Sequence, residues 1–82
     1  MYRKLGEFDK AVMMYEHALT NAEKLGSKEC LATTYENLGM VYKCRGELDD
    51  ARKMWVEAIR LYDNLKSPRA VQARELLLHI DQ

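Results

Sequence analysis

The 82 residues suffice for one compact domain at most, and a core of that size leaves only a narrow margin of stability. Hydrophobic residues at 48% and charged residues at 32%, with one proline and four glycines, argue against disorder and favour a soluble α-helical protein. Thirteen basic side chains balance thirteen acidic ones, which disfavours nucleic acid or a membrane surface as a partner, and no apolar run approaches the roughly 20 residues of a membrane span.

The two cysteines favour a reducing compartment. Cys30 and Cys44 fall on one predicted helix, about 21 Å apart, so they cannot form a disulfide within that helix. No CxxC pair occurs and neither histidine lies near a cysteine at ligand spacing, so we expect no metal and no cofactor. Because residues 1–5 lack the apolar stretch of a signal peptide, the expected location is cytoplasmic.

Glycine, serine and proline divide the chain into predicted helices. We expect a helical stub at residues 1–5 and helices at about 8–25, 28–44, 48–66 and 68–81. Gly6 and Gly46 each precede an acidic stretch, which favours a helix start because negative charge is stabilised at the N-terminal end of a helix. Ser27 and the pair Ser67-Pro68 are the expected N-terminal caps of two further helices. Connections of two or three residues predict antiparallel neighbours.

The chain resembles itself at an offset of 40 residues. Ten positions coincide: Tyr2 with Tyr42, Gly6 with Gly46, Glu7 with Glu47, Asp9 with Asp49, Ala11 with Ala51, Met14 with Met54, Ala18 with Ala58, Leu25 with Leu65, Ser27 with Ser67, and Leu38 with Leu78. Most are residue types that set how closely helices pack and where they end. Gly39 lies inside a predicted helix, at a cost of about 1 kcal/mol relative to alanine, and we attribute it to a close approach by Ala51.

A second pattern lies within residues 35–58, at Tyr35, Leu38, Gly39, Tyr42, Gly46, Ala51, Trp55 and Ala58. This order of an aromatic residue, Leu-Gly, Tyr, a turn Gly, Ala, an aromatic residue and Ala resembles the signature of the tetratricopeptide repeat (TPR) family. Its second half recurs as Tyr2, Gly6, Ala11, Tyr15 and Ala18. The common family period is about 34 residues. The offset of 40 resembles the longer-helix variety found in the kinesin light chain and in scaffolds that bind G-protein regulators and polarity proteins.

The resemblance implies an all-α fold of antiparallel helical hairpins stacked as a right-handed superhelix. It divides a single TPR-like domain, residues 1–82, into the second half of one repeat (1–26), a full repeat (27–66) and a capping or degenerate helix (67–82). In that last helix His79 stands where Gly39 would recur. Because fewer than three repeats rarely bury a continuous core, a homodimer formed by domain exchange is an alternative.

In this family the first helix of each hairpin lines a concave groove, so the resemblance implies a scaffold that binds a protein or peptide without catalysis. The expected groove residues are Arg3, Lys4, Thr33, Glu36, Asn37, Met40, Lys43 and Cys44. Arg3, Lys4 and Lys43 predict a basic patch for an acidic or C-terminal peptide segment, with Asn37 bonded to the peptide backbone. The alternative for each residue is a solvated surface position.

Other function classes have weaker support. No nucleophile with a base, paired carboxylates or glycine-rich phosphate loop favours an enzyme. The offset places Ala73 and Leu77 in the groove, which does not fit the carboxylate clamp of a chaperone-tail adaptor. The last helix carries more apolar side chains than one small face can hide: Val71, Leu77, Leu78 and Ile80, with Leu76 off the main stripe. The alternatives are that they cover the preceding helix, contact a partner helix, or meet the same surface in a second chain, and self-association is the alternative function. A helical-repeat RNA binder is a third class, disfavoured by the neutral charge.

Overall fold

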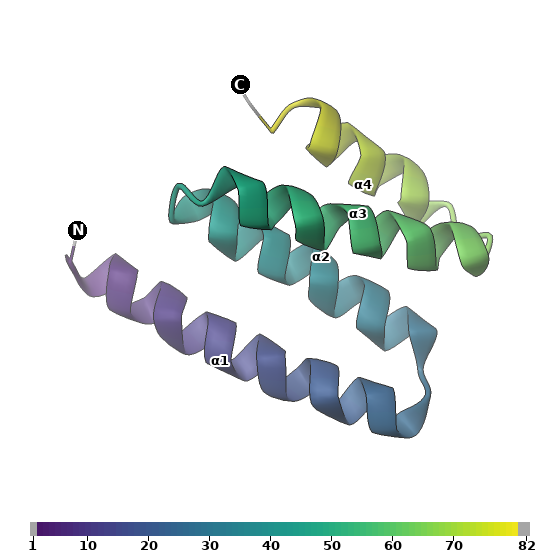
Figure 1. The fold of residues 1–82 in the computed structure, drawn as a ribbon, viewed down its shortest axis with the longest axis horizontal. Coiled ribbons are helices and arrows are strands. Elements are labelled where there is room, and N and C mark those ends of the chain that lie inside the picture. Colours follow the sequence, from purple (N-terminus) through teal and green to yellow (C-terminus); the bar gives the residue numbers. More distant parts are fainter. Residues whose placement is uncertain (1, 81–82) are drawn as a thin grey trace.

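The computed structural model describes the backbone of residues 2–80 and the side chains of residues 7–80. This part of the chain forms four helices, α1 (Tyr2–Leu25), α2 (Lys28–Cys44), α3 (Leu48–Asn64) and α4 (Arg69–Leu78). Figure 1 shows α1 and α3 running in one direction and α2 and α4 in the other. The predicted all-α row of antiparallel helices is confirmed.

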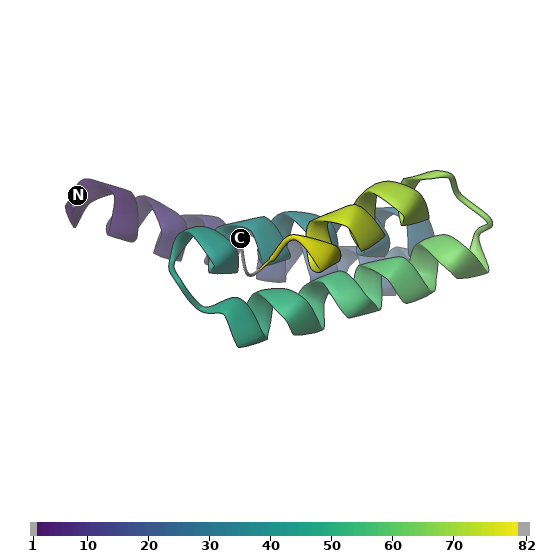
Figure 2. The same ribbon diagram turned by 90° about the horizontal axis from the view of Figure 1, so that it is seen from above.

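The helices pack in chain order, with α2 between α1 and α3 and with α4 against α3. Seen from above, α2 and α4 lie on the same side of α3 (Figure 2). The Cα atoms span 39 × 31 × 16 Å, so the molecule is a flat slab. Among the described helices, none has the length and apolar character needed to cross a membrane.

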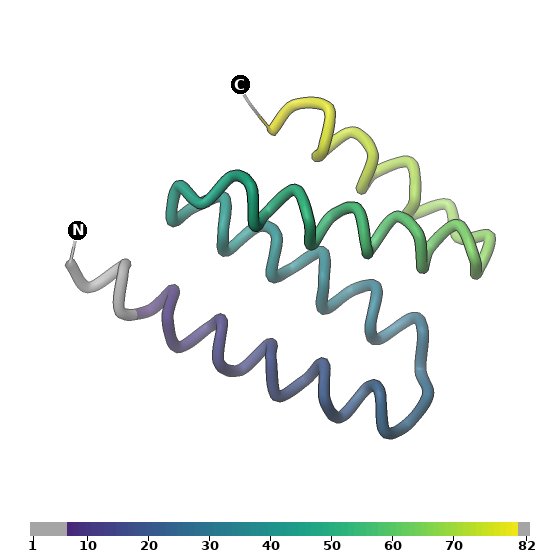
Figure 3. The backbone as a smooth tube through the Cα atoms, viewed as in Figure 1, coloured from purple at the N-terminus to yellow at the C-terminus, as the bar shows by residue number. Residues whose placement is uncertain are grey.

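Three turns of one kind join the helices (Figure 3). Gly26, Gly46 and Lys66 have positive φ angles of 70°, 86° and 56°. In each turn the following residue donates its backbone N–H to a carbonyl five residues earlier: Ser27 to Ala22 at 3.1 Å, Glu47 to Tyr42 at 2.9 Å, and Ser67 to Tyr62 at 2.8 Å. This is the Schellman pattern, which satisfies carbonyl groups at a helix end. Lys66 adopts it without being glycine.

α1 differs from the predicted elements at Gly6. The sequence predicts a break there, yet α1 is one continuous helix from Tyr2 to Leu25. A turn at Gly6 would forfeit helical hydrogen bonds that the continuous helix keeps. A glycine inside a helix costs only about 1 kcal/mol. The prediction of a stub followed by a helix from residue 8 is therefore wrong.

The ends of α2 and α3 lie close to their predicted positions. α2 spans the predicted residues, and the Ser27 hydroxyl caps it by accepting a hydrogen bond from the Cys30 N–H at 3.3 Å. α3 ends at Asn64, two residues early, because Leu65 and Lys66 form the turn. The predicted cap at Ser27 is thus confirmed.

α4 begins with a tighter turn than α2. The N–H of Ala70 bonds to the carbonyl of Ser67, and that of Val71 to Pro68, both at 3.2 Å and across three residues. In α2 the corresponding bond, from Leu31, spans four residues. Three-residue spacing is 3₁₀ geometry, which rotates about 120° per residue instead of about 100°. The first turn of α4 therefore rotates differently from that of α2, so the faces of α4 do not follow the 40-residue offset unchanged.

The core is built along α3. Two clusters of buried residues form it: Ala32, Ala58, Tyr62, Ala70 and Ala73 in one, and Ala51, Trp55 and Ile80 in the other. Alanines let the helix backbones approach closely, and the two large rings fill the space between them. Of the other repeat-signature residues, Leu38 and Gly39 are buried, Tyr35 and Tyr42 are half-buried, and Gly46 is exposed in its turn. Burial raises the pKa of Tyr35 and Tyr42, and nearby carboxylates raise it further.

Gly39 faces Trp55, and the attribution of this glycine to Ala51 is wrong. A Cβ atom at position 39 would lie 2.2 Å from the indole Nε1. That nitrogen donates a hydrogen bond to the Glu36 carbonyl of α2 at 3.0 Å. The antiparallel register therefore places the tryptophan ring, rather than the smaller alanine, against the glycine.

Candidate functional site

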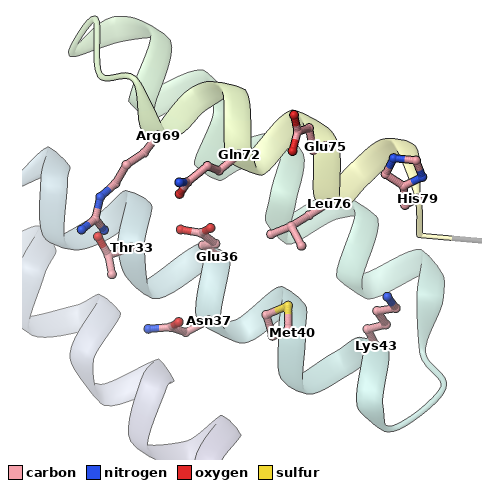
Figure 4. Close-up of a pocket in the computed structure, with 10 residues that line it drawn as sticks. All are labelled: Thr33, Glu36, Asn37, Met40, Lys43, Arg69, Gln72, Glu75, Leu76 and His79. Carbon is pink, nitrogen blue, oxygen red and sulfur yellow. The ribbon is translucent and has the colours of Figure 1, made fainter.

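A groove of about 670 Å³ opens between α2 and α4. It is lined by Thr33, Glu36, Asn37, Met40 and Lys43 from α2, and by Arg69, Gln72, Glu75, Leu76 and His79 from α4 and its C-terminal cap (Figure 4). We call it the α2–α4 groove. Its volume lies within the range of ligand pockets, about 300–1,000 Å³.

Five of the eight expected groove residues meet in this groove, and they are the five on α2 just named. Cys44 is exposed and does not line it. Arg3 and Lys4 lie outside the residues whose side chains are described. The structure thus brings together the predicted groove residues of α2 other than Cys44.

The α4 half of the groove was not predicted. The 40-residue offset assigns Ala73 and Leu77 to the groove, but Ala73 is buried in the core and Leu77 packs against Trp55 and its neighbours. At an offset of 39, four groove residues of α2 correspond to four groove residues of α4 and its C-terminal cap. The pairs are Thr33 with Gln72, Glu36 with Glu75, Asn37 with Leu76, and Met40 with His79. Helical periodicity alone could have found this face, because residues 69, 72, 76 and 79 are three or four apart.

A hydrogen-bonded cluster fixes one end of the groove. The Tyr62 hydroxyl, buried under α2, donates to Glu36 Oε1 at 3.0 Å and lies 3.3 Å from the Thr33 hydroxyl. Arg69 reaches over from α4 toward Thr33 (Figure 4). A hydrogen bond to the Tyr62 hydroxyl raises the pKa of the Arg69 guanidinium, so this side chain stays positively charged. The Glu36 carboxylate of α2 is thus held by Tyr62 of α3, which also interacts with Arg69 of α4.

Elsewhere in the groove, two polar side chains form no hydrogen bond or ion pair with another described residue. Asn37 and Lys43 are half-buried, and neither has a hydrogen-bond or ion-pair partner among the described residues. Met40 and Leu76 supply an apolar surface between them. The groove therefore combines an amide, an ammonium group and an apolar floor.

The groove carries no net charge. Lys43 and Arg69 are balanced by Glu36 and Glu75. The predicted basic patch depended on Arg3 and Lys4, whose side chains lie outside the described part. A bound ligand would thus contact positively and negatively charged side chains at separate places in the groove.

No metal centre is formed by the described residues, among which no three His, Cys, Asp or Glu side chains gather closely enough to hold an ion. Cys30 and Cys44 are free and exposed. The chemistry of the groove consists of hydrogen bonding, ion pairing and apolar contact.

The sequence model of the tetratricopeptide repeat family matches residues 1–64. The chain therefore belongs to the tetratricopeptide repeat family. Members of this family generally mediate protein–protein interactions and are typically non-catalytic scaffolds. Neither the curated proteins nor the solved structures contain a significant match. The matched region includes α1, α2 and α3, and the α4 wall of the groove lies beyond it.

Proposed function

We propose that this protein is a cytoplasmic scaffold module that holds a protein or peptide partner in the α2–α4 groove and catalyses no reaction. The observation that carries the proposal is the pair Asn37 and Lys43, which line the groove and have no hydrogen-bond or ion-pair partner among the residues whose side chains are described. Neither the amide nor the ammonium group is among the buried side-chain atoms that lack a partner, so both are open to solvent and can bond to a ligand. The free thiols of Cys30 and Cys44 fit a reducing cytoplasm.

The proposed ligand is an acidic or C-terminal peptide segment. Its carboxylate pairs with Lys43, its backbone bonds to the Asn37 amide, and an apolar side chain rests on Met40 and Leu76. The Glu36 carboxylate, held by Tyr62, closes the other end and disfavours a second carboxylate there. The groove thus gives the peptide a preferred direction.

Self-association is the second candidate. Leu25, Met14 and Leu78 are 81%, 70% and 76% exposed, although isolated helices seldom leave several large apolar side chains in water. A domain-exchanged homodimer would cover them.

The groove proposal can be tested with a displayed library of random peptides that end in a free carboxylate. We expect selected peptides to be enriched in acidic residues, and Asn37→Ala or Lys43→Glu to weaken their binding about tenfold in calorimetry. Lys53→Glu on α3, an exposed lysine away from the groove, is the matched control and should leave the affinity unchanged.

Two results would count against the proposal. Unchanged affinity of both groove variants, with an intact helical spectrum, would remove these residues from the site. Selection of basic peptides would contradict the proposed carboxylate ligand.

A further inference from the structure

A second groove, between α3 and α4, is almost purely apolar. It is lined by Val56, Ile59, Leu77 and Leu78, with Arg74 at its edge, and we call it the α3–α4 groove. Leu78 is 76% exposed and Val56 is 48% exposed. No residue of the α2–α4 groove lines it. A ligand there is independent of the peptide site.

The internal repeat indicates what kind of element covers this surface. At the offset of 39 that relates the two helices, Ala32 and Gly39 of α2 correspond to Val71 and Leu78 of α4. Ala32 is buried, and Gly39 lies under the Trp55 ring of α3. Val71 and Leu78 are exposed. The exposed side of α4 thus corresponds to the side of α2 that packs against α3.

α1 has the complementary exposed face. At the offset of 40 it corresponds to α3, with Ala11, Tyr15 and Ala18 in the places of Ala51, Trp55 and Ala58. The three α3 residues are fully buried, whereas their α1 counterparts are only half-buried. In α3 this face packs against both α2 and α4. α1 packs against α2, and no second described helix covers its corresponding face.

We propose that α1 of a second copy of this chain occupies the α3–α4 groove. The pair formed by α4 and the incoming α1 would repeat the arrangement of α2 and α3, and the row of helices would continue from one copy into the next. Different surfaces meet in such a contact, so it is heterologous and can extend to further copies instead of closing as a two-fold dimer. The proposal therefore differs from domain exchange.

The proposed contact between copies is weaker than the α2–α3 contact that it resembles. Leu78 occupies the place of Gly39, and Tyr15 that of Trp55, so the close approach of ring to glycine cannot be repeated. Apolar burial without that fit favours a reversible association. We expect the mean mass of the unmodified chain in sedimentation to rise steadily with concentration.

Two variants test the two surfaces separately. Leu78→Lys places a charge in the α3–α4 groove, and Met14→Lys places one on the exposed side of α1. Each should raise the dissociation constant at least about tenfold. Met13→Lys is the matched control: Met13 is 60% exposed, and α3 itself carries lysine at the corresponding position 53. It should associate like the unmodified chain.

Mixing the two variants gives the decisive measurement. Leu78→Lys keeps an intact α1 and Met14→Lys keeps an intact α3–α4 groove, so an equimolar mixture should form one-to-one dimers and nothing larger. Far-UV circular dichroism establishes that both variants are folded. An unmodified chain with a constant monomer mass, a closed dimer of constant mass, or a mixture that stays monomeric would each overturn the proposal.

Discussion

Gly39 leaves the space that the Trp55 indole fills, and this contact defines the distance between α2 and α3. The glycine lacks the side chain that would collide with the ring, and the ring in turn bonds to the Glu36 carbonyl at 3.0 Å. The hydrogen bond matters because a buried indole N–H without an acceptor is costly. Steric fit and polar satisfaction therefore depend on the same pair.

Gly39→Ala should destabilise the protein, although alanine is the better helix former by about 1 kcal/mol. The added methyl group would overlap the Trp55 ring, and overpacking of a buried site typically costs about 1–3 kcal/mol, more where the overlap involves a rigid ring. We expect a net loss of about 2 kcal/mol in the free energy of unfolding, measured by urea titration. Stability equal to the parent would show that α3 can shift, and the effect should shrink in a Trp55→Leu background.

At the scale of the elements, the three Schellman turns show how the chain reverses. Positions 26, 46 and 66 carry the left-handed residue, and only Lys66 does so with a side chain. The left-handed conformation costs a non-glycine residue roughly 1–2 kcal/mol. The turn before α4 is thus the strained one of the three.

Lys66→Gly should stabilise the protein by about 0.5–1 kcal/mol, since the relief of strain is partly offset by the greater freedom of glycine in the unfolded chain. Lys53→Gly, the same substitution inside α3, should instead destabilise by about 1 kcal/mol. Thermal unfolding of both variants gives the comparison. A loss of stability in Lys66→Gly would contradict the assigned turn.

The sequence predicted the helices well because their determinants are local. The spacing from Tyr35 to Ala58 and the cap at Ser27 depend on residue types within a few turns of the chain. The one-residue shift of α4 could not be predicted from the 40-residue offset, because an offset carries no information on how the first turn of a helix is wound, and α4 begins with a 3₁₀ turn where α2 does not. Hence the α2 side of the candidate site was predicted and the α4 side was not.

The failure at Gly6 has a related cause. A glycine at a turn position produces a reversal only where the tertiary contacts of the turned chain outweigh the hydrogen bonds of a continuous helix. The sequence pattern cannot weigh that tertiary requirement.

At the scale of the whole molecule, the helices are unequally covered. α3 packs against helices on two sides, whereas α1 packs against α2. α1 also forms an ion pair with the turn between α2 and α3, where the Arg45 guanidinium lies 3.2 Å from the Asp9 carboxylate. A half-exposed ion pair of this kind contributes at most about 1 kcal/mol. In a row of helices, stability depends on neighbour contacts, so the ends are weaker than the centre.

Hydrogen exchange should reveal this gradient. Amides of α2 and α3 should exchange most slowly, and those of α1 should exchange faster despite the greater length of that helix. The measurement belongs at low protein concentration, where a second copy does not cover α1. Equal protection of α1 and α3 under those conditions would indicate a single cooperative unit instead.

Trp55 is the single tryptophan of the chain, and its position makes it an intrinsic optical reporter. Its indole is bonded to the backbone of Glu36, and the carboxylate of that same residue lines the α2–α4 groove. A ligand that displaces Glu36 by even a small distance would change the polarity and hydrogen bonding at the indole nitrogen. Occupancy of the groove can therefore be followed by fluorescence in the unlabelled protein.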